Sequence, residues 1–200
     1  INSQIKYQLS PASTGVFNID SDTGIIRLVA DLDRESNPSY NLTIIAYNPI
    51  APELTSEATI MVTVLDVNDN PPEFERSSYY TTIPESAKVG TIIVGVKATS
   101  LDVGINADIT YSILAGNEQG KFAIDSNKGV LTVAEPLDHE LSREYFITVI
   151  ATDRGTPPLT NTAIVVINIT DINDNAPRFS QDAYSVHVLE NVAPGTEIFK

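Results

Sequence analysis

The stretch LDVNDNPPEF at residues 65–74 returns, with its polar pattern intact, as TDINDNAPRF at residues 170–179. Each copy places two Asp, two Asn and at least one Pro directly after a run rich in β-branched residues. Asn, Asp and Pro favour turns, whereas β-branched side chains favour strands. The pattern therefore predicts a strand that ends in a polar turn, and its return predicts a chain built from repeated units.

Other segments recur at the same separation of 105 residues, in three pairs: FNIDSDTGIIRL (17–28) with FAIDSNKGVLTV (122–133), LDRE (32–35) with LDHE (137–140), and YYTTIPESAKVGTII (79–93) with YSVHVLENVAPGTEI (184–198). We therefore predict three units. Residues 1–70 form a repeat that lacks its first strands, residues 71–175 form a complete repeat, and residues 176–200 supply the first strands of a third.

Hydrophobic residues in the complete repeat follow the period of β-strands rather than of helices. In REYFITVIATD, for example, Tyr145, Ile147 and Val149 alternate with Phe146 and Thr148. Apolar runs between turn signals predict seven strands, at residues 77–84, 90–98, 108–114, 121–125, 129–133, 144–152 and 162–170. Seven short strands in about 100 residues are typical of an antiparallel sandwich with Greek-key connections. The predicted fold class is all-β, with seven-stranded sandwiches in tandem.

The 200-residue chain has 26 acidic and 12 basic side chains and a formal charge of −14. Such a charge repels nucleic acid and anionic membrane surfaces, and it favours cations or basic partners. No apolar run reaches the roughly 18–20 residues that span a bilayer, and the opening INSQIKYQLS has no signal-peptide pattern. We expect a segment of a longer protein that makes no direct lipid contact.

The repeated polar motifs offer hard oxygen ligands, the type of which Ca²⁺ takes six to eight. Zinc and copper are poorly served, because the chain has no Cys and its two His, His139 and His187, are expected to be surface residues. Magnesium fits less well because it keeps several waters. One Asn-Asp-Asn-Pro stretch alone would be read as a turn, but its recurrence beside a recurring Asp-x-Glu motif indicates a calcium site.

LDVNDNPPEF, LDRE, ATDRGTPP (151–158) and GINADITYSI (104–113) together resemble the extracellular repeats of the cadherin superfamily. The style of the motifs is similar to that of the long, non-strand-swapping cadherins of the Fat, Dachsous, cadherin-23 and protocadherin type. The resemblance implies cadherin-type Greek-key sandwiches joined end to end, with up to three Ca²⁺ ions at each complete junction.

The resemblance also implies which residues bind these ions. At the first junction the ligands would be Asp33, Glu35, Asp66, Asn68, Asp69, Asp102 and Asp153, with backbone carbonyls of Val67, Asn70 and Asn106. At the second junction they would be Glu85, Asp138, Glu140, Asp171, Asn173 and Asp174, with carbonyls of Ile172 and Asn175.

Two departures from the family pattern concern the ion count. Ser100 stands where the family has the first Asp of Asp-x-Asp, and the first repeat lacks the Glu that would precede its Asp-x-Glu motif. We therefore expect weaker or fewer calcium ions at the first junction. Asn48 similarly replaces the acid that Asp153 supplies in the second repeat, which predicts weak calcium binding at any upstream junction.

Two sequons, Asn41-Leu42-Thr43 and Asn168-Ile169-Thr170, are candidate N-glycosylation sites and favour an extracellular location. The resemblance implies the ectodomain of a single-pass plasma-membrane protein. Its expected function is calcium-dependent cell–cell adhesion or recognition, with another cadherin ectodomain, the same or different, as partner on an opposing or the same cell.

Two alternatives stay open from sequence: a passive rigid spacer in a long ectodomain, or a secreted calcium-binding adhesin repeat. An enzyme is not expected. The acid pair Asp33 and Glu35 could suit a glycosidase, but both acids recur with the same partners in the second repeat, as structural ligands would. A Ser–His–Asp triad is not expected, because the chain has two His, one inside the Asp-x-Glu motif and one in a predicted first strand. The chain also has no glycine-rich phosphate loop.

Overall fold

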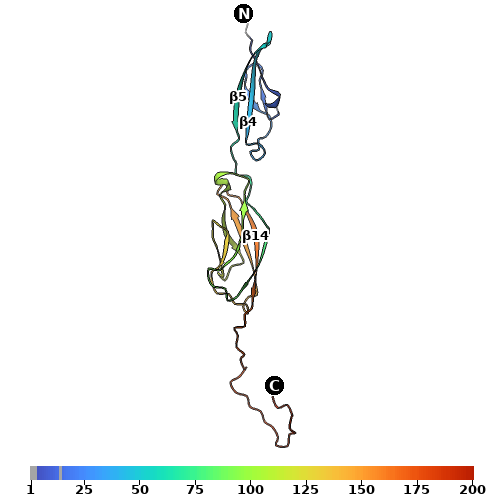
Figure 1. Cartoon of the computed structure of the whole chain (residues 1–200), viewed down its shortest axis with the longest axis vertical. Coiled ribbons are helices and arrows are strands. Elements are labelled where there is room, and N and C mark those ends of the chain that lie inside the picture. The colour runs from blue at the N-terminus through green and yellow to red at the C-terminus, as the bar shows by residue number, and fades with distance from the viewer. Residues whose placement is uncertain (1–3, 14) are drawn as a thin grey trace.

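The structure, a computed structural model, describes residues 4–13 and 15–200. Two β-sandwiches lie end to end along the long axis, and residues 176–200 run on beyond the second as an extended tail (Figure 1). Apart from the short 3-10 turns η1 (Pro11–Ser13) and η2 (Gly104–Ala107), the regular elements of the described chain are strands. The all-β prediction is confirmed.

The second repeat has two main sheets. One has the order β10 (Thr110–Ala115), β13 (Glu144–Thr152), β14 (Thr160–Thr170) and β7 (Ser78–Pro84), and the other the order β11 (Phe122–Ile124), β12 (Val130–Val133) and β8 (Ile92–Gly95). Neighbouring strands are antiparallel except β14 and β7, which pair in parallel. That pair joins the beginning of the repeat to its end.

The core of the second repeat comes from the inward residues of both sheets. Ile147, Val149, Val165, Ile167 and Leu131 each have 0% exposure. The predicted alternation in β13 is confirmed, because Tyr145, Ile147 and Val149 are buried while Phe146 faces outward. Each fully buried aliphatic side chain contributes about 1.5–3 kcal/mol through its removal from water, so this layer positions the loops at both ends of the sandwich.

The prediction of one strand over residues 90–98 is wrong. β8 covers only Ile92–Gly95, and a separate short strand, β9 (Ala98–Thr99), pairs with β6 (Glu73–Phe74), which was not predicted. Between them the N–H of Val96 donates to the carbonyl of Gly129 at 2.9 Å. The chain thus leaves one sheet and enters another within a few residues, a switch that a continuous apolar run does not reveal.

The first repeat has the equivalent strands. β1 (Lys6–Leu9), β4 (Ser39–Asn48) and β5 (Ala51–Thr63) form one sheet, and β2 (Phe17–Ile19) and β3 (Ile26–Leu28) form a hairpin. Its smaller core contains Leu9, Phe17 and Leu42. The strands β4, β2 and β3 stand one repeat length before β13, β11 and β12, so the structure follows the sequence repeat.

Residues 176–200 contain no strand in the structure, and their side chains are exposed. In the second repeat the corresponding strand, β7, forms by parallel pairing with β14. No strand within residues 4–13 and 15–200 gives residues 176–200 such a partner. Their assignment to a third repeat, like the predicted limits of the first two repeats, stays a prediction.

Candidate metal-binding junctions

The linker between the sandwiches runs from the end of β5 to β6, through the LDVNDNPPEF stretch. Pro71 and Pro72 close the linker, and Pro72 is fully buried. Proline fixes its own φ and restricts the residue before it. The two prolines therefore hold the polar residues 66–70 at a set distance from β6.

Three predicted ligands from both repeats meet at this junction. A carboxylate oxygen from each of Glu35, Asp66 and Asp102 lies within 4.8 Å of the other two. Glu35 and Asp66 belong to the first repeat and its linker, whereas Asp102 precedes η2 of the second. The sequence motifs, far apart along the chain, thus converge on one small volume of negative charge.

Arg34, which is not among the predicted ligands, also lies in this cluster. Its Nε lies 2.5 Å from Oδ1 of Asp66, one terminal nitrogen pairs with Glu35, and the same nitrogen donates to the carbonyl of Leu101 at 2.7 Å. Burial opposes its charged form, but Asp66 and Glu35 together raise the Arg34 pKa. Arg34 is the middle residue of the Asp-x-Glu motif, and this position in the sequence could have indicated that it lies near the acids.

Asp66 accepts hydrogen bonds across the junction. Its Oδ2 accepts from the N–H of Val103 at 3.1 Å and from the side-chain amide of Asn106 at 2.9 Å. Burial opposes ionisation of Asp66, but these donors and Arg34 outweigh it, so the pKa of Asp66 is lowered. Asn106 was expected to contribute its carbonyl, and this stays a prediction; in the structure its side-chain amide bonds to Asp66.

Asp102 is 4% exposed and faces the linker. Its two oxygens accept from the side-chain amide of Asn70 at 2.8 Å and from the Asn70 N–H at 3.3 Å. The same Asn70 amide donates to Asp69 at 2.6 Å. Asp69 and Asp102, two predicted ligands from different repeats, therefore share one donor.

Ser100, the departure from the family pattern, is engaged in the same network. Its hydroxyl donates to the carbonyl of Asn70 at 2.9 Å and accepts from the N–H of Asp102 at 3.1 Å. A serine hydroxyl brings no charge, and here both of its roles are used for local hydrogen bonds.

Asp153 and Asn68 meet on another side of the junction. Asp153 is 2% exposed, and its Oδ1 accepts from the amide of Asn68 at 3.2 Å and from the N–H groups of Gly155 and Leu159. Its Oδ2 is buried with no hydrogen-bond partner among the described residues. Buried polar atoms are nearly always partnered, so this oxygen fits a site that accepts a cation.

Gly155 makes room for Asn68. A Cβ built at position 155 would lie 2.1 Å from Cγ of Asn68, and the Asn68 amide also donates to the carbonyl of Pro157 at 2.6 Å. Any larger residue at position 155 would displace this linker side chain.

Asp33, Val67 and Asp69 line a small hollow beside the acid cluster. The Asp33 carboxylate accepts from the Ser36 hydroxyl at 2.6 Å, and this bond together with the Ser36 N–H lowers its pKa. The Val67 carbonyl accepts from the Asp69 N–H at 3.0 Å. Asp33 therefore lies next to Glu35 but bonds within its own turn.

The second group of predicted ligands is also partly assembled. One oxygen from each of Glu85, Asp138 and Glu140 lies within 4.8 Å of the others. Glu85 is 7% exposed and accepts from the N–H groups of His139 and Ile172, both at 2.8 Å. These two donors lower the Glu85 pKa.

The remaining predicted ligands of the second group lie on the exposed stretch 171–175. Potential ligand atoms of His139, Glu140 and Asp171 also lie within 4.8 Å of one another, and His139 is half-buried. The Asn175 amide donates to Glu140 at 2.9 Å and to Asp174 at 2.8 Å. The N–H of Asp174 donates to the Ile172 carbonyl at 2.8 Å. Asn173 is exposed.

The two sequon asparagines lie in strands rather than in loops. Asn41 is in β4 and Asn168 in β14, and both are exposed. His187 is exposed within the tail.

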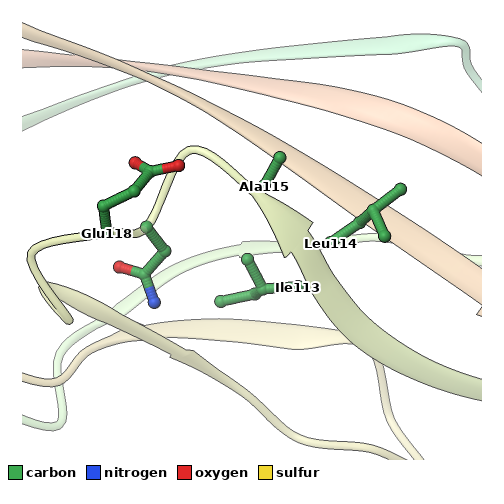
Figure 2. Close-up of a pocket in the computed structure, with 5 residues that line it drawn as sticks. Ile113, Leu114, Ala115 and Glu118 are labelled. Carbon is green, nitrogen blue, oxygen red and sulfur yellow. The ribbon is translucent and has the colours of Figure 1, made fainter.

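A surface hollow at the end of β10 has none of the features of these junctions. Ile113, Leu114 and Ala115 approach it from the strand and Glu118 from the following loop (Figure 2). Glu118 is its single ionisable lining residue, and its carboxylate accepts from the Gly116 N–H at 3.1 Å. The side chains with metal-binding chemistry lie instead at the ends of the sandwiches.

Within residues 4–13 and 15–200, no helix is long and apolar enough to cross a bilayer.

The fold and these junctions define a tandem Greek-key module, and the sequence comparisons agree. The family model described as Cadherin domain matches residues 1–65 and 79–170. The chain belongs to the cadherin family. Cadherin repeats are not enzymes, so the prediction of a non-enzymatic chain is confirmed by this membership.

Relatives of the Fat type are similar to the chain over nearly all its length. It is 50% identical to the Fat-like cadherin-related tumor suppressor homolog of Drosophila melanogaster and 48% identical to Protocadherin Fat 1 of Homo sapiens. These matches cover 99% and 96% of the chain but 4% of each relative. The predicted likeness to long cadherins is confirmed.

Solved structures show the same fold. Protocadherin Gamma B2 extracellular cadherin domains 3-6 superimposes with a TM-score of 0.79 at 31% identity, over 88% of this chain and 43% of that one.

Proposed function

We propose that the chain is an extracellular cadherin segment whose repeats are joined and stiffened by Ca²⁺, in the service of cell–cell adhesion or recognition. The observation that carries the proposal is the meeting of Glu35, Asp66 and Asp102, contributed by two repeats, within 4.8 Å. These three residues would bind a metal through carboxylate oxygens, the type of ligand that a hard cation such as Ca²⁺ prefers.

The ligands proposed for the first junction are those of the family pattern. The side chains are Asp33, Glu35, Asp66, Asn68, Asp69, Asp102 and Asp153, and the carbonyls are those of Val67, Asn70 and Asn106. The buried, unpartnered Oδ2 of Asp153 supports a cation there. The second group, from Glu85 to Asn175, is proposed as the second repeat's contribution to an equivalent junction between residues 71–175 and a third repeat at 176–200.

The first junction is proposed to hold fewer than three ions, or to hold its last ion weakly. Ser100 contributes no carboxylate, and its hydroxyl is hydrogen-bonded to Asn70 and Asp102. Arg34 already neutralises part of the charge on Asp66 and Glu35. Both features reduce the net negative charge available to calcium.

Electrostatic repulsion explains how calcium would stiffen the chain. Two like unit charges 4 Å apart repel by about 1 kcal/mol in water and by about 4 kcal/mol at the effective dielectric of a protein surface. Without a cation, the acids of the two repeats favour separation of the sandwiches. An ion bound to ligands of both repeats removes the repulsion and ties the sandwiches together.

Small-angle X-ray scattering of the purified chain, in 2 mM calcium and after chelation, tests this proposal. We expect a narrow distribution of long maximum dimensions with calcium and a broader, more variable one without it. Equal scattering in both conditions would contradict calcium-dependent stiffening. Isothermal titration in parallel counts the ions and their affinities, and the first junction should bind fewer than three ions or bind its third ion weakly.

The proposed partner is another cadherin ectodomain, the same or different. Analytical ultracentrifugation in calcium separates two cases. A dimer indicates that these repeats carry a homophilic surface, whereas a monomer at high concentration indicates a spacer or a heterophilic binder.

A further inference from the structure

The outer face of the four-stranded sheet in the second repeat carries an apolar row. Phe146, Val166 and Tyr80 are in direct register on the adjacent strands β13, β14 and β7. Phe146 is 58% exposed and Tyr80 is 76% exposed. The solvent face of such a sheet is normally polar, so two large exposed aromatic rings in one row need an explanation.

This row is separate from the core. Val166 is only 7% exposed, yet it does not belong to the core cluster of the repeat, whereas its neighbours Val165 and Ile167 do. Because alternate residues of a strand point to opposite faces, Val166 is buried by what lies beside it on the outer face. Phe146 and Tyr80, directly opposite it on both sides, form with it a shallow apolar platform.

Asn168 stands at the edge of this platform. It is exposed, it lies two residues beyond Val166 on the same face of β14, and it pairs with Glu144 of β13 and Thr82 of β7. Phe146 and Tyr80 are therefore its diagonal neighbours, a relation that spans about 7–8 Å and is within reach of long or aromatic groups. Thr170, the third residue of the sequon, is exposed on the same face.

We propose that Asn168 carries an N-linked glycan whose first N-acetylglucosamine packs on the row of Phe146, Val166 and Tyr80. A bond forms between Nδ2 of Asn168 and the anomeric carbon of the sugar. The bond from that carbon to the diphosphate of a lipid-linked oligosaccharide donor breaks, and the amide loses one proton as the diphosphate leaves. No oxidation or reduction takes place.

The platform matches the chemistry of this sugar. A pyranose ring has faces made of C–H groups and a rim of hydroxyl and amide groups. The C–H face would cover the aromatic and Val166 surface and remove it from water. The polar rim would lie near Glu144 and Thr82, which flank Asn168 directly. One occupant thus satisfies both the apolar and the polar part of this surface.

The first repeat supplies an independent comparison. Asn41 lies on β4, the equivalent of β13, at the position that corresponds to Phe146, and it pairs with Met61 of β5, which is 72% exposed. Both sequons thus face outward from equivalent sheets, but among the described residues the aromatic row is found beside Asn168 and not beside Asn41. A glycan on Asn41 would extend from the surface without this platform.

This inference does not depend on the calcium proposal, because the row lies on a face of the sandwich and the acids lie at its ends. The test uses the chain secreted from a eukaryotic cell line. Peptide mass spectrometry after enzymatic deglycosylation in heavy-oxygen water, which converts the modified Asn to labelled Asp, should detect a glycan at Asn168. An unmodified Asn168 overturns the proposal.

Packing of the sugar is measured by thermal unfolding of the second repeat, before and after deglycosylation, in chains with and without the platform. In the unaltered chain we expect removal of the Asn168 glycan to lower the midpoint by roughly 4 °C. In Phe146→Thr, which introduces a β-branched residue suited to a strand, the loss should be much smaller. Tyr80→Thr provides a second variant with the same expectation if Phe146→Thr folds poorly.

Thr43→Ala removes the other sequon and is the matched control. It should leave the effect at Asn168 unchanged, and loss of the Asn41 glycan should itself have little effect on the midpoint. An equal loss of stability in the unaltered chain and in the platform variants would show that the glycan is attached without packing, and would overturn the proposed contact.

Discussion

At the scale of single residues, Ser100 distinguishes the first junction from a full family ligand set. Its hydroxyl bridges the Asn70 carbonyl and the Asp102 N–H. An aspartate there could still accept from Asp102, but it could not donate to Asn70, whose carbonyl would become free for a cation.

We predict that Ser100→Asp strengthens calcium binding at the first junction. One added charge contributes about 1–4 kcal/mol at 4 Å, depending on the dielectric, and 1.4 kcal/mol is tenfold in affinity, so we expect a gain of about tenfold or one more ion by isothermal titration. Without calcium the same variant should be less stable than the unaltered chain. Ser100→Asn, similar in size but neutral, should not show the gain, and no gain for Ser100→Asp would contradict the proposed role.

Gly155 leaves the space in which the Asn68 side chain packs against the second repeat. A Cβ at position 155 would collide with the Asn68 side chain, and would thereby break its bonds to Asp153 and to the Pro157 carbonyl. We predict that Gly155→Ala weakens calcium binding and broadens the scattering profile in calcium. Gly95→Ala is the control, because a Cβ there meets no atom within 4 Å. Identical calcium affinity for both variants would show that the Asn68 contact is dispensable.

At the scale of elements, each hairpin turn of the smaller sheet depends on an aspartate. Between β11 and β12, the Asp125 carboxylate accepts from the N–H groups of Asn127 and Lys128, both at 2.9 Å. In the first repeat Asp20 has the same role between β2 and β3, with the Thr23 N–H at 2.8 Å. The repeat therefore preserves a turn mechanism as well as a strand order.

This turn predicts a pH dependence. The N–H groups of Asn127 and Lys128 lower the pKa of Asp125, so its stabilising effect is present above the unfolded value of about 3.9 and is lost as the pH falls through the lower folded value. Asp125→Asn should be less stable than the unaltered chain at pH 7, and the difference should vanish near pH 2–3. Urea unfolding across this range measures it, with Glu135→Gln as a control for loss of an exposed acid. A difference that does not change with pH would rule out the charge as its source.

At the scale of the whole molecule, the chain is a linear series of sandwiches whose relation depends on their junctions (Figure 1). The bonds from Arg34 to Leu101 and from Asn68 to Pro157 cross from one repeat to the next. Asp66 and Asn70 also bond across the junction, and all of these bonds join polar side chains rather than a packed apolar core, so the junction is the part of the described chain most open to control by a cation.

Calcium should accordingly raise thermal stability in a concentration-dependent way. A ligand that binds only the folded state at ten times its dissociation constant stabilises it by about 1.4 kcal/mol, and extracellular modules bind calcium at about 10⁻⁴–10⁻³ M. We expect the calorimetric midpoint to rise steadily with calcium in that range. Magnesium at equal concentration should have much less effect. A midpoint that does not depend on calcium would contradict ligation in the folded chain.

Much of the molecule follows from local sequence. Period-two alternation predicted β13, because the pattern of burial on a strand depends on neighbouring residues in the same segment. The recurring acidic motifs, through their resemblance to cadherin repeats, predicted which acids share a junction, and Glu35, Asp66 and Asp102 lie together in the structure. The repeat predicted that both sandwiches would share one strand order.

The tertiary structure alone decided the features that depend on distant partners. The break in 90–98 arises because Val96 bonds to Gly129 and the chain then enters a second pairing with β6. Arg34 and Asn68 acquire their roles from Asp66 and Gly155, far away in sequence or in another repeat. The row beside Asn168 exists because three strands align in register. The sequence determined which residues carry strands and charge, whereas long-range pairing determined which of them touch.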